Sequence, residues 1–129
     1  MPVFQAPGTF FGRVTADVYL QTANAIAYSA SLSLDVSLRN DFQIGVLTGN
    51  LSVTFTNPSV GRQGFVWVRQ DATGSRTVSF AASGYTVLKD VSLVDVNPQA
   101  AANSVTVYTY TMVSLGGTDY LVITKTFLA

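Results

Sequence analysis

The stretch "SLSLDVSL", Ser31–Leu38, alternates between polar and apolar residues from end to end. Its apolar residues are Leu32, Leu34, Val36 and Leu38, one at every second position. Successive side chains of a β-strand point to opposite faces, whereas an amphipathic helix repeats its apolar residues every three to four positions. The stretch therefore predicts a strand with one face in a core and the other in water.

The same kind of pattern fills the chain on the C-terminal side of this stretch. Residues 42–55 hold two more such runs, and Pro58 ends the second because proline lacks the backbone donor that a sheet uses. Residues 104–128 read as two strands joined in a hairpin by Gly116-Gly117. We count about eight to ten short strands, with a turn signal about every ten residues and no long helix. These features predict an all-β fold, either an antiparallel β-sandwich or a jelly-roll-like barrel.

The beginning of the chain has a different composition. Residues 1–15 contain two prolines, two glycines and the aromatic residues Phe4, Phe10 and Phe11, without helical or strand periodicity. Because a free tail is usually polar, we expect an extended N-terminal arm here, packed on its own domain or reaching onto a neighbouring subunit. Residues 16–129 are expected to form one β-sandwich domain, since a chain of 129 residues suits a single core. The pattern predicts no leader peptide and no membrane-spanning helix.

Charge is scarce in this sequence. Seven Lys and Arg residues balance seven Asp residues, and charged residues make up 11% of the chain, against about 25% in typical soluble domains. The basic residues are spread along the sequence, so we expect neither nucleic acid nor an anionic membrane as a partner. Low charge with zero net charge favours association. The composition therefore predicts a surface that is largely covered by copies of the chain or by other partners.

Several late strands are apolar on both faces, which supports this prediction. In residues 105–113, two valines face one way, and Tyr108, Tyr110 and Met112 face the other. Only one of these faces can fill the core, and the other would be an exposed apolar patch unless an arm or another subunit covered it. We therefore predict a subunit or capsid interface, which would comprise Phe4, Phe10, Phe11, Tyr108, Tyr110 and Met112.

A charged loop interrupts the pattern in "RQDATGSRTVSF", Arg69–Phe80. We expect a compact hairpin connection, in which Gly74 takes a positive φ and the Asp71 carboxylate accepts hydrogen bonds from backbone N–H groups. Arg69 and Arg76 flank the loop and could both pair with Asp71. Every polar residue then has a local structural role, so the loop is interpreted as a turn rather than a ligand site.

The residues for most catalytic chemistry are missing. The sequence has no His, Cys or Glu, which excludes Ser-His-Asp and Cys-His nucleophiles and the usual zinc sites. Glycoside hydrolysis would need two Asp side chains in one cleft. Asp90 and Asp95 lie nearest in a strand-like segment, but a spacing of five places them on opposite faces of a regular strand. We therefore expect no catalytic residue, no metal and no cofactor.

The aromatic residues allow two interpretations. They could make a sugar-binding platform, or they could be core and interface residues, because they lie within the strand patterns. The residues concerned are Trp67, Tyr85, Tyr108, Tyr110 and Tyr120.

One long stretch, Leu47–Phe80, combines four sequence features. It contains the turn Leu47-Thr48-Gly49-Asn50, then Phe55-Thr56-Asn57-Pro58 at a strand end, then Gly64, and then Gln70-Asp71-Ala72-Thr73-Gly74-Ser75-Arg76-Thr77-Val78. This order resembles a recurring β-domain of tailed-bacteriophage virion proteins, which is shared by tail-fibre, baseplate and head decoration proteins. Phe80 stands where that group often has Trp, and "AASGYTVLKD" replaces its usual Gly- and Pro-containing loop.

The resemblance implies a structural virion protein, assembled in the host cytoplasm, rather than an enzyme. Its leading implication is a capsid decoration or cement protein that forms a homotrimer and stabilises the head shell by contacts with itself and with the major capsid protein or other virion proteins. The alternative is a tail or fibre module that binds host-surface carbohydrate, with Trp67 or Tyr85 in contact with the sugar. A third interpretation is a spike-type glycosidase that uses Asp side chains.

Overall fold

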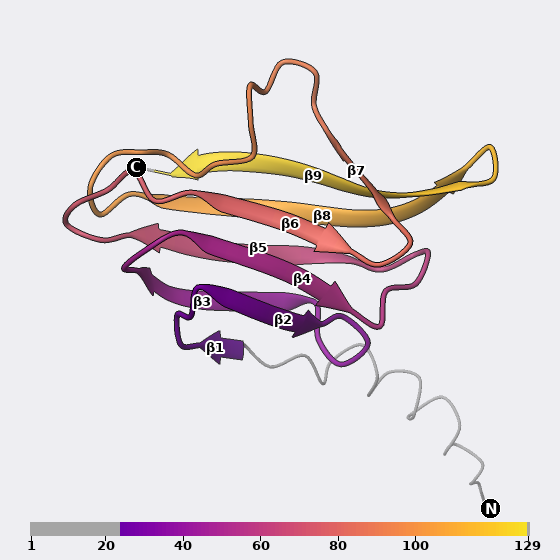
Figure 1. The fold of residues 1–129 in the computed structure, drawn as a ribbon, viewed down its shortest axis with the longest axis horizontal. Helices are drawn as coiled ribbons and strands as arrows, with labels where there is room; N and C mark the ends of the chain where they lie inside the picture. The colour runs from indigo at the N-terminus through magenta and orange to yellow at the C-terminus, as the bar shows by residue number, and fades with distance from the viewer. Residues whose placement is uncertain (1–23, 129) are drawn as a thin grey trace, which may run out of the picture.

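The computed structural model describes residues 24–128, which form nine strands and no helix (Figure 1). The strands make two sheets, a six-stranded sheet in the order β1-β3-β5-β8-β9-β7 and a three-stranded sheet in the order β2-β4-β6. The strands are β1 (Asn24–Ile26), β2 (Ser31–Asp35), β3 (Asp41–Leu47), β4 (Leu51–Thr56), β5 (Gln63–Gln70), β6 (Val78–Ala82), β7 (Thr86–Lys89), β8 (Val105–Leu115) and β9 (Thr118–Leu128).

The first six strands follow a coiled path. Odd-numbered strands join the larger sheet and even-numbered strands join the smaller one, so the chain changes sheet at every connection. Within each sheet the successive strands are parallel, β1 with β3 and β5, and β2 with β4 and β6. The connections are short, and residues 48–50 alone carry the chain from β3 to β4.

The expected β-sandwich is therefore confirmed, but the expected strand directions are largely wrong. In the part of the chain that the structure describes, five of the seven strand pairings are parallel. The antiparallel pairings are β5 with β8 and β8 with β9, the latter closed by the expected Gly116-Gly117 turn. A jelly roll is built from antiparallel strands, so the coiled part of the fold has a different arrangement.

The core lies between the two sheets and is rich in aromatic rings. Phe55 of β4 packs on Phe80 of β6 and on Tyr110 of β8, with ring centroids 5.9 and 4.6 Å apart. Phe80 also meets Tyr108 edge-on at 4.8 Å. Fully burying one such side chain stabilises a fold by about 1.5–3 kcal/mol. This cluster therefore fixes how the smaller sheet sits on the larger one.

The structure corrects two assignments of face. Tyr108, Tyr110 and Met112, which were expected at a subunit or capsid interface, are each 0% exposed and belong to the core between the sheets. Their side chains are covered by this chain's own strands, and the opposite face of β8 points away from the core. Leu38, expected on the core face, lies beyond the end of β2 and is 74% exposed.

The expected N-terminal arm, residues 1–15 with Phe4, Phe10 and Phe11, lies outside the described residues. Among residues 24–128 we find no helix of the length and apolar character needed to span a membrane.

Candidate functional site

The larger sheet has one side that faces away from the smaller sheet. We call this side the outer face. It carries the odd-numbered residues of β5 and β8 and the even-numbered residues of β9, because these lie opposite one another in the strand register. On these three strands Arg69 is the single charged residue of that face, and the others are Val, Thr, Leu, Gln and aromatic residues. This composition is unusual for a surface in contact with water.

Two aromatic rings stand on the outer face at the β3–β5 side. Phe65 and Trp67 are two residues apart on β5, with ring centroids 6.4 Å apart and ring planes inclined at 48°. Phe65 is 47% exposed and Trp67 is half-buried. On the neighbouring strand, Asp41 lies opposite Phe65 and Gln43 lies opposite Trp67. We call these four residues the aromatic patch.

Hydrogen bonds hold the aromatic patch in place. The Trp67 indole Nε1 donates to Asp41 Oδ1 at 2.8 Å, and Gln43 Nε2 lies 3.5 Å from Asp41 Oδ2. An ionised carboxylate has about four acceptor positions, so these two contacts leave Asp41 able to accept from further donors. The patch thus combines two ring faces with a fixed carboxylate and an amide, which suits a ligand that has both C–H faces and hydroxyl groups.

The other aromatic residues proposed for a sugar platform do not gather around Trp67. Tyr108 and Tyr110 are core residues, and Tyr85 packs partly buried against the core. Tyr120 is on the outer face opposite Val113, whereas Trp67 lies opposite Val107, six residues away along β8. The sequence analysis missed Phe65 as a companion of Trp67, although their spacing of two on one strand indicated a shared face.

The charged loop after β5 is held by local bonds. Asp71 Oδ1 accepts from the backbone N–H groups of Thr73 and Gly74 at 3.1 and 3.0 Å, and Asp71 Oδ2 pairs with Arg76 Nη2 at 2.8 Å. The hydrogen bond from Arg76, followed by those from the backbone, lowers the pKa of Asp71 below its ordinary 3.8. Gly74 has a φ of +74°. Arg69 lies on the exposed face of β5.

This loop is not a hairpin, which corrects the sequence-based prediction. It carries the chain from β5 in the larger sheet to β6 in the smaller one, and these two strands do not pair. Gln70 supports the crossing, because its buried amide accepts from the Arg76 backbone N–H and donates to the backbone carbonyls of Arg76 and Gln99, each at 3.0 Å.

Four of the described carboxylates lack the raised pKa of a glycosidase general acid. The pKa values of Asp35, Asp71, Asp90 and Asp95 are all lowered, mainly by hydrogen bonds from nearby Ser, Arg or backbone groups. A general acid needs the opposite shift. Within residues 24–128, no three Asp side chains gather where they could hold a metal ion together.

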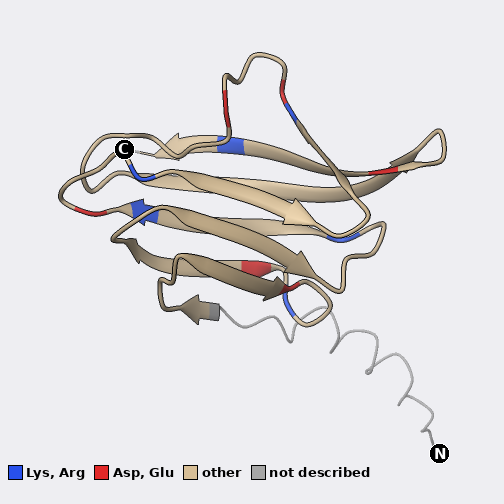
Figure 2. Cartoon of the chain, viewed as in Figure 1, with Lys and Arg blue, Asp and Glu red and all other residues tan. Residues whose placement is uncertain are grey.

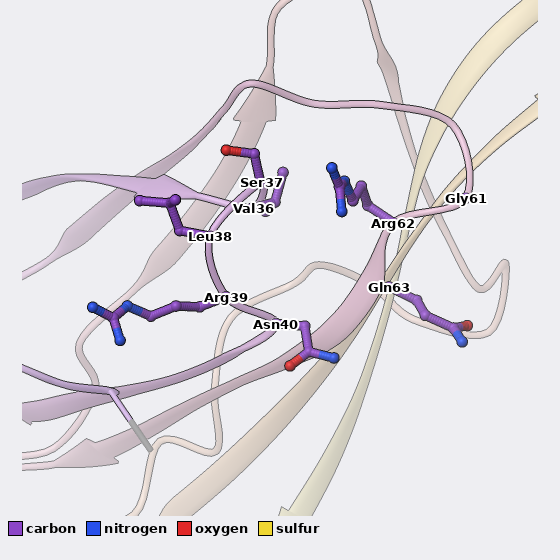
Figure 3. Close-up of a pocket in the computed structure, with 8 residues that line it drawn as sticks. All are labelled: Val36, Ser37, Leu38, Arg39, Asn40, Gly61, Arg62 and Gln63. Carbon is purple, nitrogen blue, oxygen red and sulfur yellow. The ribbon is translucent and has the colours of Figure 1, made fainter. Parts of the chain in front are cut away.

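A cavity of about 300 Å³ lies where the β2–β3 and β4–β5 connections approach each other. Figure 3 shows that Arg39 and Arg62 enter from different loops and that their guanidinium groups lie well apart. Figure 2 shows charged residues scattered over loops and strand ends rather than gathered in one place. The two arginines therefore do not form a shared anion site.

The fold is a β-sandwich whose larger sheet carries an apolar and aromatic outer face. Comparison with protein families identifies the family to which the chain belongs. The family described as "putative phage tail fibre C-terminal domain" matches residues 14–119, and the chain belongs to this family. Comparisons with curated proteins and with solved structures found no match. The expected relation to tailed-phage structural virion proteins is thereby confirmed, and the family description points to the tail rather than the head.

Proposed function

We propose that this chain is a non-enzymatic, host-contacting module of a phage tail fibre, and that it binds host-surface carbohydrate through the aromatic patch. The observation that carries the proposal is the pairing of Phe65 and Trp67 on an open sheet face, next to Asp41 and Gln43. Sugar rings present apolar C–H faces and a rim of hydroxyl groups. Aromatic faces suit the former, and carboxylate and amide groups suit the latter.

The pre-formed geometry of the patch supports binding. The bond from Trp67 Nε1 to Asp41 fixes the indole ring before any ligand arrives. A ring that is already ordered loses little conformational entropy on binding, so more of the stacking energy appears as affinity. The family description supports a tail-fibre location over the capsid decoration function that the sequence analysis favoured.

The rest of the outer face suits self-association. On β8 and β9 it consists of Val, Thr and Leu residues with Tyr120, without a charged group. We propose that copies meet there as a homotrimer, which leaves the β3–β5 side to the ligand. Light scattering at several concentrations tests this: a trimer mass that Val122→Asp, on β9, reduces to a monomer mass supports the proposal, and a monomer at every concentration contradicts it.

Binding to immobilised host-surface polysaccharides tests the carbohydrate proposal. Trp67→Ala should weaken binding at least tenfold, which corresponds to about 1.4 kcal/mol. Phe127→Ala is the matched control, because it removes an exposed aromatic side chain that lies on the opposite face of the larger sheet, beside the buried Thr106, and it should bind as the parent does. Equal effects of both substitutions, or no polysaccharide bound by the parent chain, would contradict the proposal.

The same mixtures test the absence of catalysis. We expect no new reducing ends after prolonged incubation with a bound polysaccharide. Cleavage that is lost in Asp41→Asn while the fold persists would contradict the non-enzymatic part of the proposal and favour the glycosidase interpretation.

A further inference from the structure

The coil formed by β1 to β6 is open at its beginning. Within the described residues, β1 is an edge strand of the larger sheet and β2 is an edge strand of the smaller one, and both lie at the same end of the sandwich (Figure 1). Coiled β-structures generally need a cap at each end, because an open end exposes unpaired backbone groups and core side chains.

The backbone groups of β2 identify its free edge. The Ala30 carbonyl accepts from Ser52 N–H, and Val36 N–H donates to the Thr56 carbonyl. Even-numbered residues of β2 therefore bond to β4, since bonding alternates along a parallel strand. The N–H and C=O groups of Ser31 and Ser33 and the N–H group of Asp35 consequently point to the free edge, where a further strand could pair with them. The Asp35 carbonyl instead accepts from Leu38 N–H at 3.3 Å.

Apolar side chains line a cavity at the same end. A cavity of about 260 Å³ between the two edge strands is lined by Ile26, Leu34, Leu38 and Phe42, together with Ser33, Asp35 and Arg39. Leu38 is 74% exposed there. A strand with an apolar face that paired with β2 would cover this opening and the free edge together.

The sequence just before β1 has the pattern of such a strand. Val14, Ala16, Val18 and Leu20 alternate with Thr15, Asp17 and Tyr19. The family match begins at residue 14, so the whole segment lies within the matched part of the chain. We propose that Val14–Leu20 caps the coil by pairing in parallel with β2 of the same chain, with its apolar residues over the cavity.

The lengths of the connections between strands favour Val14–Leu20 as the segment that pairs with β2. Only residues 21–23 separate the segment from β1, and a connection of that length, residues 48–50, already carries the chain from one sheet to the other. β1 pairs with β3 at an offset of 18 residues, as in Asn24 with Phe42. The same offset would set Val14 beside Leu32, so that the apolar residues of both segments would lie on one face. The alternation between sheets also assigns the strand before β1 to the smaller sheet, next to β2.

A pair of substitutions in the full chain tests the cap. Val18→Asp puts a charge on the face proposed to cover the cavity, and Thr15→Asp puts the same charge on the opposite face. We expect Val18→Asp to lower Tm by about 4 °C or more and to reduce hydrogen-exchange protection of the Ser33 and Asp35 amides at least tenfold. Thr15→Asp should change neither quantity. Val18→Ser provides a milder version of the same test should Val18→Asp not fold.

Three results would overturn the proposal. The first is that both aspartate substitutions act alike, and the second is that β2 amides are unprotected in the parent chain. The third concerns the source of the strand. If unlabelled parent chain restores β2 protection in labelled Val18→Asp chain, the segment comes from a neighbouring copy. None of these measurements involves carbohydrate, so they stand independently of the proposed function.

Discussion

Two core tyrosines on the same strand should respond in opposite ways to the loss of their hydroxyl groups. Tyr108 and Tyr110 both lie on β8 and are both 0% exposed. The Tyr108 hydroxyl donates to the Val96 carbonyl at 2.6 Å. The Tyr110 hydroxyl has no hydrogen-bond partner among the described residues. Burial raises the pKa of Tyr110 to about 12, so its hydroxyl stays protonated at neutral pH.

The magnitudes follow from what each hydroxyl does. Tyr108→Phe removes a hydrogen bond and leaves the Val96 carbonyl without it, which costs about 1–2 kcal/mol of unfolding free energy. Tyr110→Phe removes a buried hydroxyl whose desolvation is not compensated, a penalty of about 1–3 kcal/mol, offset in part by lost packing contacts. We expect Tyr110→Phe to stabilise the fold by about 1 kcal/mol.

Urea unfolding of the parent chain and the two variants measures the difference. The m-values should stay equal, because the same surface is exposed in each case, and the two midpoints should move in opposite directions. If Tyr110→Phe destabilises the fold as much as Tyr108→Phe does, the Tyr110 hydroxyl is hydrogen-bonded, and the account of the core given above is wrong.

Three further predictions concern the loops. Gly74→Ala should cost more than about 1 kcal/mol in urea unfolding, because φ is +74° and a Cβ would press on a carbonyl of the loop before β8; an unchanged midpoint would refute this. Asp71 has a lowered pKa, so its pair with Arg76 stabilises the fold above about pH 3.8 and loses this effect as the pH falls through the lower folded-state pKa. Asp71→Asn should remove that acid-dependent part of the thermal melt, and an identical pH profile would contradict the role of the pair. Val91 is 99% exposed, so Val91→Ser should shift stability by less than about 0.5 kcal/mol, and a larger loss would mean that Val91 is covered.

Strand positions and core faces could be predicted from the sequence where one face is clearly polar. Leu51, Val53 and Phe55 alternate with polar residues, and all three are buried as expected. In β8 both faces are apolar, so alternation cannot choose between them, and Tyr108 and Tyr110 were placed on the wrong side. The choice depended on the smaller sheet, which packs its own aromatic residues against that face.

Strand pairing could not be predicted for a different reason. A short polar connection such as residues 48–50 serves equally well to reverse a strand within one sheet or to cross to another sheet. The bonds of Asp71 and Gly74 could be anticipated, because they are local to one loop. The sheet that the chain enters after that loop could not be predicted, because the choice of sheet depends on contacts with strands far away in the sequence.

The coiled path also has a consequence for the order of folding. Each parallel pairing among β1 to β6 joins residues 18 to 27 positions apart, so every such pairing must first close a loop, and such topologies fold slowly. The hairpin of β8 and β9 needs only the two-residue turn at Gly116-Gly117, and hairpins of this kind form within about 1–10 μs. We expect the last strands of the chain to form first and to serve as the template on which the earlier coils assemble.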